Sequence, residues 1–241
     1  MSDGLSPAIT LRPATPADAD GAAALMYAVG PKLFNRIYGP RPEDAIRFFG
    51  AAFLQPGTPF SQENVIVAEH AGEVVGLASS LPAHALRLAW PTVGRLMLRL
   101  RGLLFLLRLL PTVFDLRGST DTTPPEAYYL GILSVRADRR GRGIGGLLLA
   151  EVCRQAQAAG CDAVCLHAEL DNDGARRFYA RHGFAVTTEH PTPRAARWGV
   201  AGFAAMRKDI AAMRKDIAAM RKDVPPGRVP PPGYTVPNTP D

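Results

Sequence analysis

The period of hydrophobic residues changes several times along this chain, and each change predicts a different element. Runs of apolar and β-branched residues predict strands at residues 9–12, 64–69, 73–80, 127–135, 163–168, 184–188 and 198–207. Apolar residues recur at helical spacing over residues 15–29, 42–53, 144–159 and 174–182. This order of strands and helices predicts an α/β fold with a crossover connection inside the sheet.

Residues 82–117 differ from the rest of the chain in charge. They contain six arginines and one acid, which gives +5 of the formal net charge of +6. Their leucines recur at helical spacing, so we predict one or two helices with a break near Gly102. Arginines interrupt the apolar runs well before the roughly 20 residues that a membrane span needs, so we expect no transmembrane helix.

Composition excludes several classes of protein. The chain is 47% apolar and 21% charged, as in ordinary globular proteins. Because most of the surplus charge lies in one segment, we expect no nucleic-acid partner. Three clustered cysteines, Cys153, Cys161 and Cys165, predict neither a disulfide framework nor a metal site. With no signal peptide at the start, a reducing, cytoplasmic location is expected.

The C-terminal part is repetitive. Residues 204–224 hold three consecutive copies of a seven-residue unit, AAMRKDI or AAMRKDV. The apolar residues are spaced as in a coiled coil, but three heptads are at the short limit for that prediction, and duplication of a segment at the end of the last strand is simpler. Seven prolines in residues 225–241 predict a disordered or extended tail.

The most informative stretch joins the strand 127–135 to the helix that follows it. Three glycines, Gly141, Gly143 and Gly146, lie where the strand turns into the helix, and three arginines beside them, Arg139, Arg140 and Arg142, add positive charge. Glycine lets the backbone approach a ligand, and free N–H groups at a helix start bind phosphate. The loop therefore predicts a diphosphate site. GxGxxG spacing also fits a dinucleotide, but the flanking arginines favour a ligand richer in phosphate.

A second motif downstream favours one interpretation. Asn172, Ala175, Phe178 and Tyr179 form NxxAxxFY, and Gly183-Phe184 follows. With Arg140, Gly143 and Gly145 in the pattern [RQ]xxGx[GA], the chain resembles the GNAT N-acetyltransferase superfamily. The resemblance is sharp over residues 127–184. It implies an α/β GNAT fold, with a mixed central sheet of six or seven strands flanked by helices and a helical insertion between strands 3 and 4.

The resemblance implies acetyl-CoA as co-substrate and names the residues that would bind it. The strands 127–135 and 163–168 would splay apart to admit the pantetheine arm, which would pair with backbone of the first strand, while the loop would hold the diphosphate. The implied binding residues are Leu133, Ser134, Val135, Arg140, Gly141, Arg142, Gly143, Ile144, Gly145, Gly146, Asn172, Ala175 and Tyr179. Asn172 would bind the arm or hold the splayed loop.

Catalysis follows from the same resemblance. An acceptor amine would attack the thioester directly, and Tyr179 would protonate the departing thiolate as general acid. Many members of the family carry a glutamate at the position of Gly131, so the general base is open here. Glu126, His167 and Glu169 are candidates, and a relay through water is another. The missing acid also leaves a second class of function open, a non-catalytic acyl-CoA-binding module.

The family implies a small-molecule or peptide amine as acceptor, bound by early helices and variable segments, with Phe34, Tyr38 and Phe49 as candidate lining. Residues 8–210 would form the GNAT domain, with 82–119 as the insertion, 211–224 as a repeat extension and 225–241 as the tail. Edge-strand or tail pairing would give a homodimer.

The insertion is open to three interpretations. It could be a packed segment whose arginines face water, a lid over the acceptor site, or an interfacial helix that touches anionic lipid or a partner subunit. Arginines facing water are our starting expectation, and membrane contact is not assumed.

Overall fold

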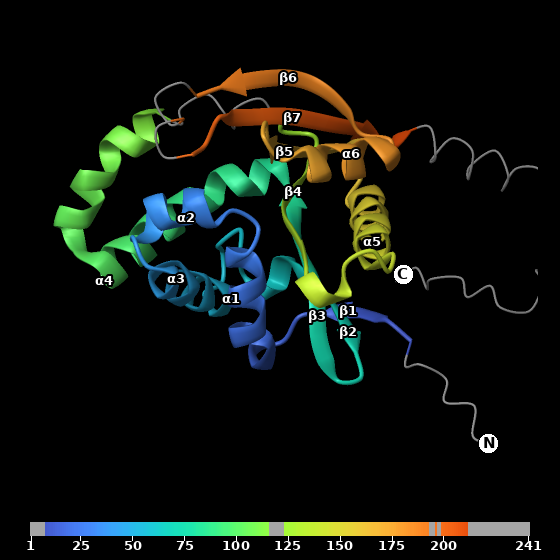
Figure 1. Ribbon diagram of the computed structural model, residues 1–241, viewed down its shortest axis with the longest axis horizontal. Coiled ribbons are helices and arrows are strands. Elements are labelled where there is room, and N and C mark those ends of the chain that lie inside the picture. Colours follow the sequence, from blue (N-terminus) through green and yellow to red (C-terminus); the bar gives the residue numbers. More distant parts are fainter. Residues whose placement is uncertain (1–7, 116–122, 193–195, 197–198, 212–241) are drawn as a thin grey trace, which may run out of the picture.

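One seven-stranded sheet organises the chain (Figure 1). The computed structural model describes residues 8–115, 123–192, 196 and 199–211. The strands lie in the order β1-β2-β3-β4-β5-β7-β6, and all neighbours are antiparallel except β4 and β5, which are parallel. The sheet is therefore mixed, as the resemblance implied, and the crossover lies between β4 and β5.

The elements follow the predicted order closely. The strands are β1 (Thr10–Pro13), β2 (Val65–His70), β3 (Glu73–Pro82), β4 (Tyr128–Val135), β5 (Ala163–Glu169), β6 (Ala185–Pro191) and β7 (Gly202–Asp209). The α-helices are α1 (Ala19–Tyr27), α2 (Pro31–Tyr38), α3 (Pro42–Leu54), α4 (Ala83–Asp115), α5 (Ile144–Ala158) and α6 (Asp173–Arg181). Short 3-10 helices η1 (Pro16–Asp18), η2 (Gln62–Asn64) and η3 (Ala137–Arg139) complete them.

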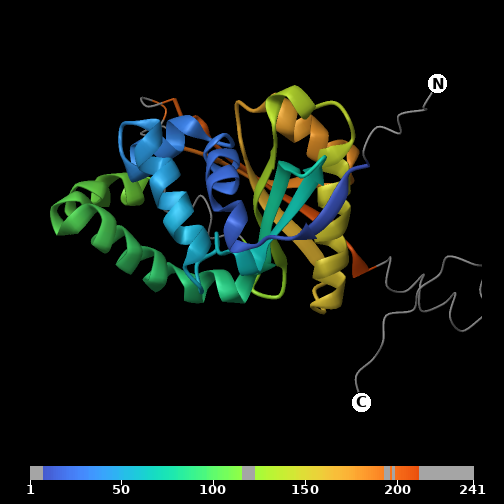
Figure 2. The same ribbon diagram turned by 90° about the horizontal axis from the view of Figure 1, so that it is seen from below.

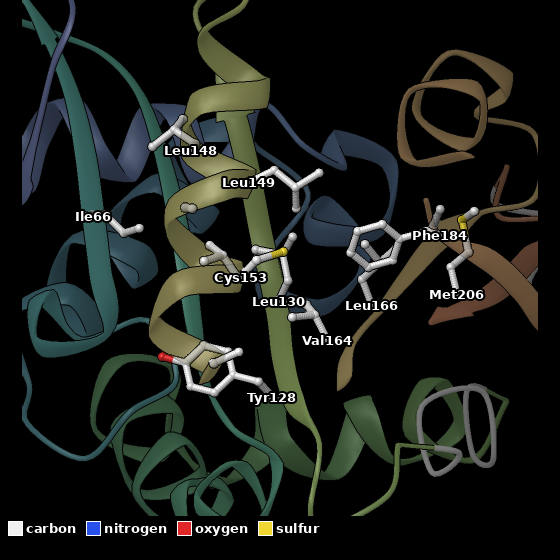
Figure 3. Packing of buried hydrophobic residues seen from close by; sticks show 14 of the residues in the cluster. Ile66, Tyr128, Leu130, Leu148, Leu149, Cys153, Val164, Leu166, Phe184 and Met206 are labelled. Carbon is white, nitrogen blue, oxygen red and sulfur yellow. The ribbon is translucent and has the colours of Figure 1, made fainter. Parts of the chain in front are cut away.

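Helices cover both faces of the sheet, and the side chains of β2 pack against helices on both faces. Val65 and Val67 pack with α1 and α3, whereas Ile66 and Ala68 pack with α5 on the opposite face. This period of two is what a strand buried on both sides requires. Figure 3 shows the layer on the α5 side, to which α5 contributes Leu148, Leu149 and Cys153 and the sheet contributes Ile66, Leu130 and Leu166.

Several boundaries differ from the sequence-based prediction, among them the end of β6, which lies at Pro191 instead of residue 188. Gly30-Pro31 ends the first helix but also begins α2, because proline is well suited to the first position of a helix. The last strand begins at Gly202, not at residue 198, since Gly202 has a φ of 142° and lies too close to the backbone of His190 for a side chain. Residues 212–241, which include most of the predicted repeat extension and the whole tail, lie outside the described residues.

α4 is the helical insertion between β3 and β4, and it bends where expected. Gly102 has φ 78° and ψ 169°, outside the helical range, so two helical halves meet there. The halves form an arc around the outside of α2 and α3 (Figures 1 and 2). The Arg101 guanidinium lies 2.7 Å from the Asp44 carboxylate and ties the bend to α3.

The early helices enclose an aromatic cluster. Tyr38 and Phe49 are buried in it, with ring centroids 5.3 Å apart, and Phe34 meets Phe49 edge-on at 4.9 Å. The expectation that all three line an acceptor pocket is therefore wrong for Tyr38 and Phe49. Both are core residues, and Phe34 alone of the three is partly exposed.

Candidate functional site

β4 and β5 pair for only three residues each. Tyr128, Tyr129 and Leu130 lie opposite Val164, Cys165 and Leu166. Beyond that point β4 continues along β3 to Val135, and β5 continues along β7 to Glu169. We call this unpaired stretch the β4–β5 split. Backbone polar groups of β4 that point away from β3 have no strand partner there, so they are available to a ligand.

A β-bulge lies at the start of the split. Ser79 of β3 faces Ile132 and Ser80 faces Leu130, so that Gly131 is the additional residue on β4. Tyr128 and Leu130 pack with α5, whereas Ile132 packs with α1 and α3, because the bulge reverses the alternation of side chains. Gly131 itself is exposed, although it lies in the middle of a central strand. The split therefore opens beside Gly131.

The glycine loop follows the far end of β4. Gly141 and Gly143 have φ values of 77° and 80°, which only glycine adopts readily, and a side chain on either would meet open space. Gly143 is the N-cap of α5, and no side chain caps this end. The first N–H groups of α5 have no partner within the helix, so they can bind an anion.

Two of the predicted arginines flank this helix start. Arg140 and Arg142 are exposed, and neither forms an ion pair with an acid in the described part of the chain. The Arg140 Nε donates a 3.0 Å hydrogen bond to the Val135 carbonyl, which holds that side chain against the end of β4. Arg139, in contrast, lies 3.5 Å from the Asp138 carboxylate. Positive charge and free N–H groups thus meet at the end of the split, as a phosphate ligand requires.

Other motif residues hold α6 in place. The Asn172 side chain accepts a 3.0 Å hydrogen bond from the Ala175 N–H and caps α6. A Cβ on Gly145 would lie 3.3 Å from the Phe178 ring, and a Cβ on Gly146 would lie 3.1 Å from His182 Nε2. The glycines therefore let α6 approach the first turn of α5. The Asn172 side chain thus caps α6, and its two predicted roles toward the arm and the splayed loop stay predictions.

Tyr179 projects from α6 into a mostly apolar setting. Its ring centroid lies 5.3 Å from that of Phe178 and 5.7 Å from that of Phe184. Burial raises the pKa of the Tyr179 phenol well above its usual value, and the neighbouring phenol of Tyr129 raises it further. Tyr179 is therefore protonated at neutral pH, which is the state a general acid needs.

Tyr129 carries no motif signal in the sequence, but pairing of β4 with β5 places it beside His167. The Tyr129 hydroxyl lies 3.2 Å from His167 Nδ1. Burial, with a smaller contribution from His190, lowers the pKa of His167 to about 4, so the imidazole is neutral at pH 7. Burial also raises the pKa of Tyr129 to about 12. Only the parallel register of the two strands reveals this pair.

The two candidate acids lie at opposite ends of the β4–β5 pair. Glu126 is exposed and precedes β4, where the strands are still paired. Glu169 is the last residue of β5, at the end of the split, and is half-buried. Burial raises the pKa of Glu169, Asp171 raises it further, and Lys32 opposes the shift. Its Oε1 would lie 3.4 Å from a Cβ on Gly30, between α1 and α2. The structure does not bring the two acids together.

This geometry agrees with what the chain is similar to. The model of the acetyltransferase (GNAT) family matches residues 33–184, more than half of the chain. The chain belongs to the GNAT acetyltransferase family. The family consists of acetyltransferases, and acetyl-CoA is the acetyl donor of the family. The β4–β5 split and the open glycine cradle at the start of α5 are the features of this GNAT chain that fit such a ligand.

Individual relatives share parts of this chain. Over 77 residues it is 39% identical to a mycothiol acetyltransferase of Corynebacterium aurimucosum, which is 31% of this chain and 24% of that protein. Over 56 residues it is 39% identical to the N-alpha-acetyltransferase MAK3 of Arabidopsis thaliana, which is 23% of this chain and 30% of that protein. The matched segment thus spans less than a third of either curated relative.

Solved structures extend the likeness to the whole fold. A crystal structure described only as an acetyltransferase is 28% identical, covers 83% of this chain and 99% of its own, and has a TM-score of 0.62. An N-acetyltransferase from Staphylococcus aureus Mu50 has the same TM-score of 0.62 at 15% identity, covering 82% of this chain and 98% of its own. The second likeness concerns the fold alone.

Proposed function

We propose that this GNAT protein transfers acetyl from acetyl-CoA to an amine of a small molecule or peptide by direct attack, with Tyr179 as general acid. The observation that carries the proposal is the β4–β5 split, which opens at the bulge of Gly131 and ends at the uncapped start of α5. Bound acetyl-CoA would supply a thioester whose carbonyl carbon accepts the amine.

The chain's own groups have separable tasks in this proposal. Unpaired backbone N–H groups of β4, among residues 133–135, would bind the arm and stabilise negative charge on the carbonyl oxygen. Residues 140–146 would hold the diphosphate through N–H groups and two arginines. Asn172 and Ala175 would act by fixing α6, and thereby the position of Tyr179.

Tyr179 is suited to donate a proton because its phenol stays protonated at neutral pH. A thiolate that leaves into an apolar setting needs such a donor, and positioned acid catalysis contributes about 10² to 10⁴ in rate. The Tyr129 phenol of β4 raises the pKa of Tyr179 further, so the two groups influence each other electrostatically. The donor and the ligand site would thus belong to the same opening.

Glu169 is the candidate that we favour as general base. Its raised pKa brings the carboxylate closer to neutral pH than an exposed glutamate, and a base is most effective in that range. His167 is a weaker base, because its pKa lies near 4. Glu126 is exposed and lies at the paired end of the strands. An acceptor amine would then approach from the side of α1 and α2, past Gly30 and Phe34.

A panel of amines tests this function. The purified chain is mixed with acetyl-CoA and amines of several classes, including small primary amines, polyamines and peptides with free N-termini, and released thiol is measured. We expect amine-dependent thiol release and acetylated product for one class. Tight acetyl-CoA binding with no release for any amine would contradict the proposal and favour a non-catalytic acyl-CoA-binding module.

A further inference from the structure

The outer surface of α4 is the most apolar exposed surface in the described part of the chain. Ten of the fourteen large hydrophobic side chains that are exposed there belong to this helix. They are Leu88, Trp90, Leu98, Leu100, Leu103, Leu104, Leu107, Leu110, Val113 and Phe114. An apolar surface of this extent on one element marks an interaction site.

The half of α4 that follows Gly102 is apolar on two sides, and one of these sides packs against the core of the protein. Phe105, Leu106 and Leu109 face inward and pack against the cluster of α1 and α3. Leu103, Leu107, Leu110 and Phe114 are spaced at four, three and four residues and form a stripe on the outside. We call this stripe the outer apolar face. Leu103, Leu107 and Leu110 on this stripe are each more than half exposed.

The half of α4 before Gly102 carries exposed arginines beside exposed leucines, as Arg95 and Arg99 do beside Leu98 and Leu100. Arg87, Arg95, Arg99 and Arg108 form no ion pair with an acid within the described residues, whereas Arg101 is paired with Asp44. The starting expectation that arginines of this segment face water is thus met for these four, but the leucines beside them face water as well. The surface is both cationic and apolar.

This combination favours one kind of partner. A second copy of the chain, related by a two-fold axis, would bring the same arginines together and would be opposed by their repulsion. A membrane surface with anionic headgroups offers opposite charge to the arginines and an apolar layer to the leucines. Among the described helices, α4 included, none has the length and hydropathy to cross a bilayer, so contact would be interfacial.

We propose that α4 docks this protein on an anionic phospholipid surface. The outer apolar face lies at the boundary between headgroups and acyl chains, and Arg95 and Arg99 contact the lipid phosphates. The arc of α4 lies on the outside of α2 and α3, away from α5 and its glycine loop, so docking leaves that loop accessible (Figure 2). This inference does not depend on acetyl transfer.

Vesicle binding by the full chain tests the proposal. Co-sedimentation is measured with vesicles of phosphatidylcholine alone and of phosphatidylcholine with phosphatidylglycerol. We expect binding to the anionic vesicles that weakens as salt rises, and little binding to the neutral ones. Failure to bind anionic vesicles at low salt would overturn the proposal, whatever the enzymatic activity.

Matched variants separate apolar from electrostatic contributions. Leu107 and Leu54 are 52% and 50% exposed, but Leu54 ends α3 and lies off the outer apolar face. We expect Leu107→Gln to weaken binding about tenfold and Leu54→Gln to leave it unchanged. Arg95→Gln and Arg99→Gln should each weaken it about fivefold, whereas Arg181→Gln on α6 should not. Equal effects of the matched pairs would contradict a specific face.

Two readouts keep the test decisive. Trp198→Phe leaves Trp90, which is half exposed on α4, as the sole tryptophan, and its emission should shift to the blue with anionic vesicles. Unchanged circular dichroism and acetyl-CoA affinity would show that Leu107→Gln is folded. If that variant instead turns a dimer into a monomer in light scattering, and vesicles are not bound, the face is a contact between copies and the lipid proposal is wrong.

Discussion

A glycine with a positive φ lies at two helix boundaries of this protein, and the two turns have different roles. Gly143 begins α5 with a φ of 80°, and Gly102 divides α4 with a φ of 78°. At Gly143 the neighbours are an open strand edge, free N–H groups and two arginines, so the turn becomes a ligand cradle. At Gly102 the neighbours are leucines, and the turn only bends a helix around α2 and α3.

The difference shows that a glycine turn defines a site only through what surrounds it. At the start of α5, the residues around the glycine turn are close to it in the sequence, because the strand, loop and helix follow one another directly. Around α4, the surroundings come from distant segments, since Asp44 on α3 holds the bend. Loss of a side chain that faces the ligand site should therefore change catalysis, and loss of the Arg101–Asp44 ion pair should change stability.

The largest effect is expected at Tyr179. Tyr179→Phe removes the hydroxyl but keeps the ring between Phe178 and Phe184, so we expect kcat to fall about 10² to 10⁴-fold with acetyl-CoA affinity unchanged. Steady-state kinetics together with calorimetry measures both. Tyr38→Phe, which removes a hydroxyl from a buried core tyrosine, is the matched control. Unchanged turnover in Tyr179→Phe would remove this residue from catalysis.

Glu169→Gln should lower kcat about 10²-fold through loss of the base. A base acts when deprotonated, so in the wild type activity falls as pH drops through the raised pKa of Glu169. That acidic limb should be absent from the residual activity of the variant. Glu126→Gln is the matched control and should retain both rate and pH profile. If Glu126→Gln loses the limb instead, the assignment of the base is wrong.

In the region of α4, Arg101→Met should lower the free energy of unfolding by about 2 kcal/mol, because it leaves the Asp44 carboxylate buried without its main partner. Burial alone would raise the pKa of Asp44, but the Arg101 guanidinium overrides this and lowers it. The contribution is therefore present at neutral pH and is lost as pH falls through the lowered pKa. Denaturant titration at several pH values measures it.

A control variant and a control measurement accompany the prediction for Arg101→Met. Arg99→Met changes an exposed neighbour without an ion pair and should be neutral within about 0.5 kcal/mol. Acetyl-CoA affinity should be the same in Arg101→Met as in the wild type. A large loss of affinity would mean that α4 and the glycine loop are not separate regions.

The smallest effect concerns the packing of α6 on α5. Gly146→Ala places a Cβ 3.1 Å from His182 Nε2, and the His182 ring is held by a 2.8 Å contact of its Nδ1 with the Phe178 carbonyl. We expect a loss of about 1 kcal/mol. Gly21→Ala in α1 meets no atom within 4 Å and should gain up to about 1 kcal/mol. Thermal unfolding compares them, and equal shifts would refute the close approach.

The sequence predicts the region of α5 and α6 better than the region of α4. Glycines, the Asn172 cap and apolar periodicity are local signals, so the strand, loop and helices of the candidate site follow from them. The Tyr129–His167 contact does not, because it depends on the parallel register of two separate strands. Periodicity placed the bend at Gly102, but it could not show which leucines of α4 face outward, since both sides of that helix are apolar.

The most direct test of the central claim is a calorimetric titration of the full chain with acetyl-CoA. If the β4–β5 split and the start of α5 form the ligand site, one molecule should bind per chain with micromolar affinity, and coenzyme A should compete with it. NAD should give no heat. No binding of acetyl-CoA at high micromolar concentration, or preference for NAD, would contradict the assignment.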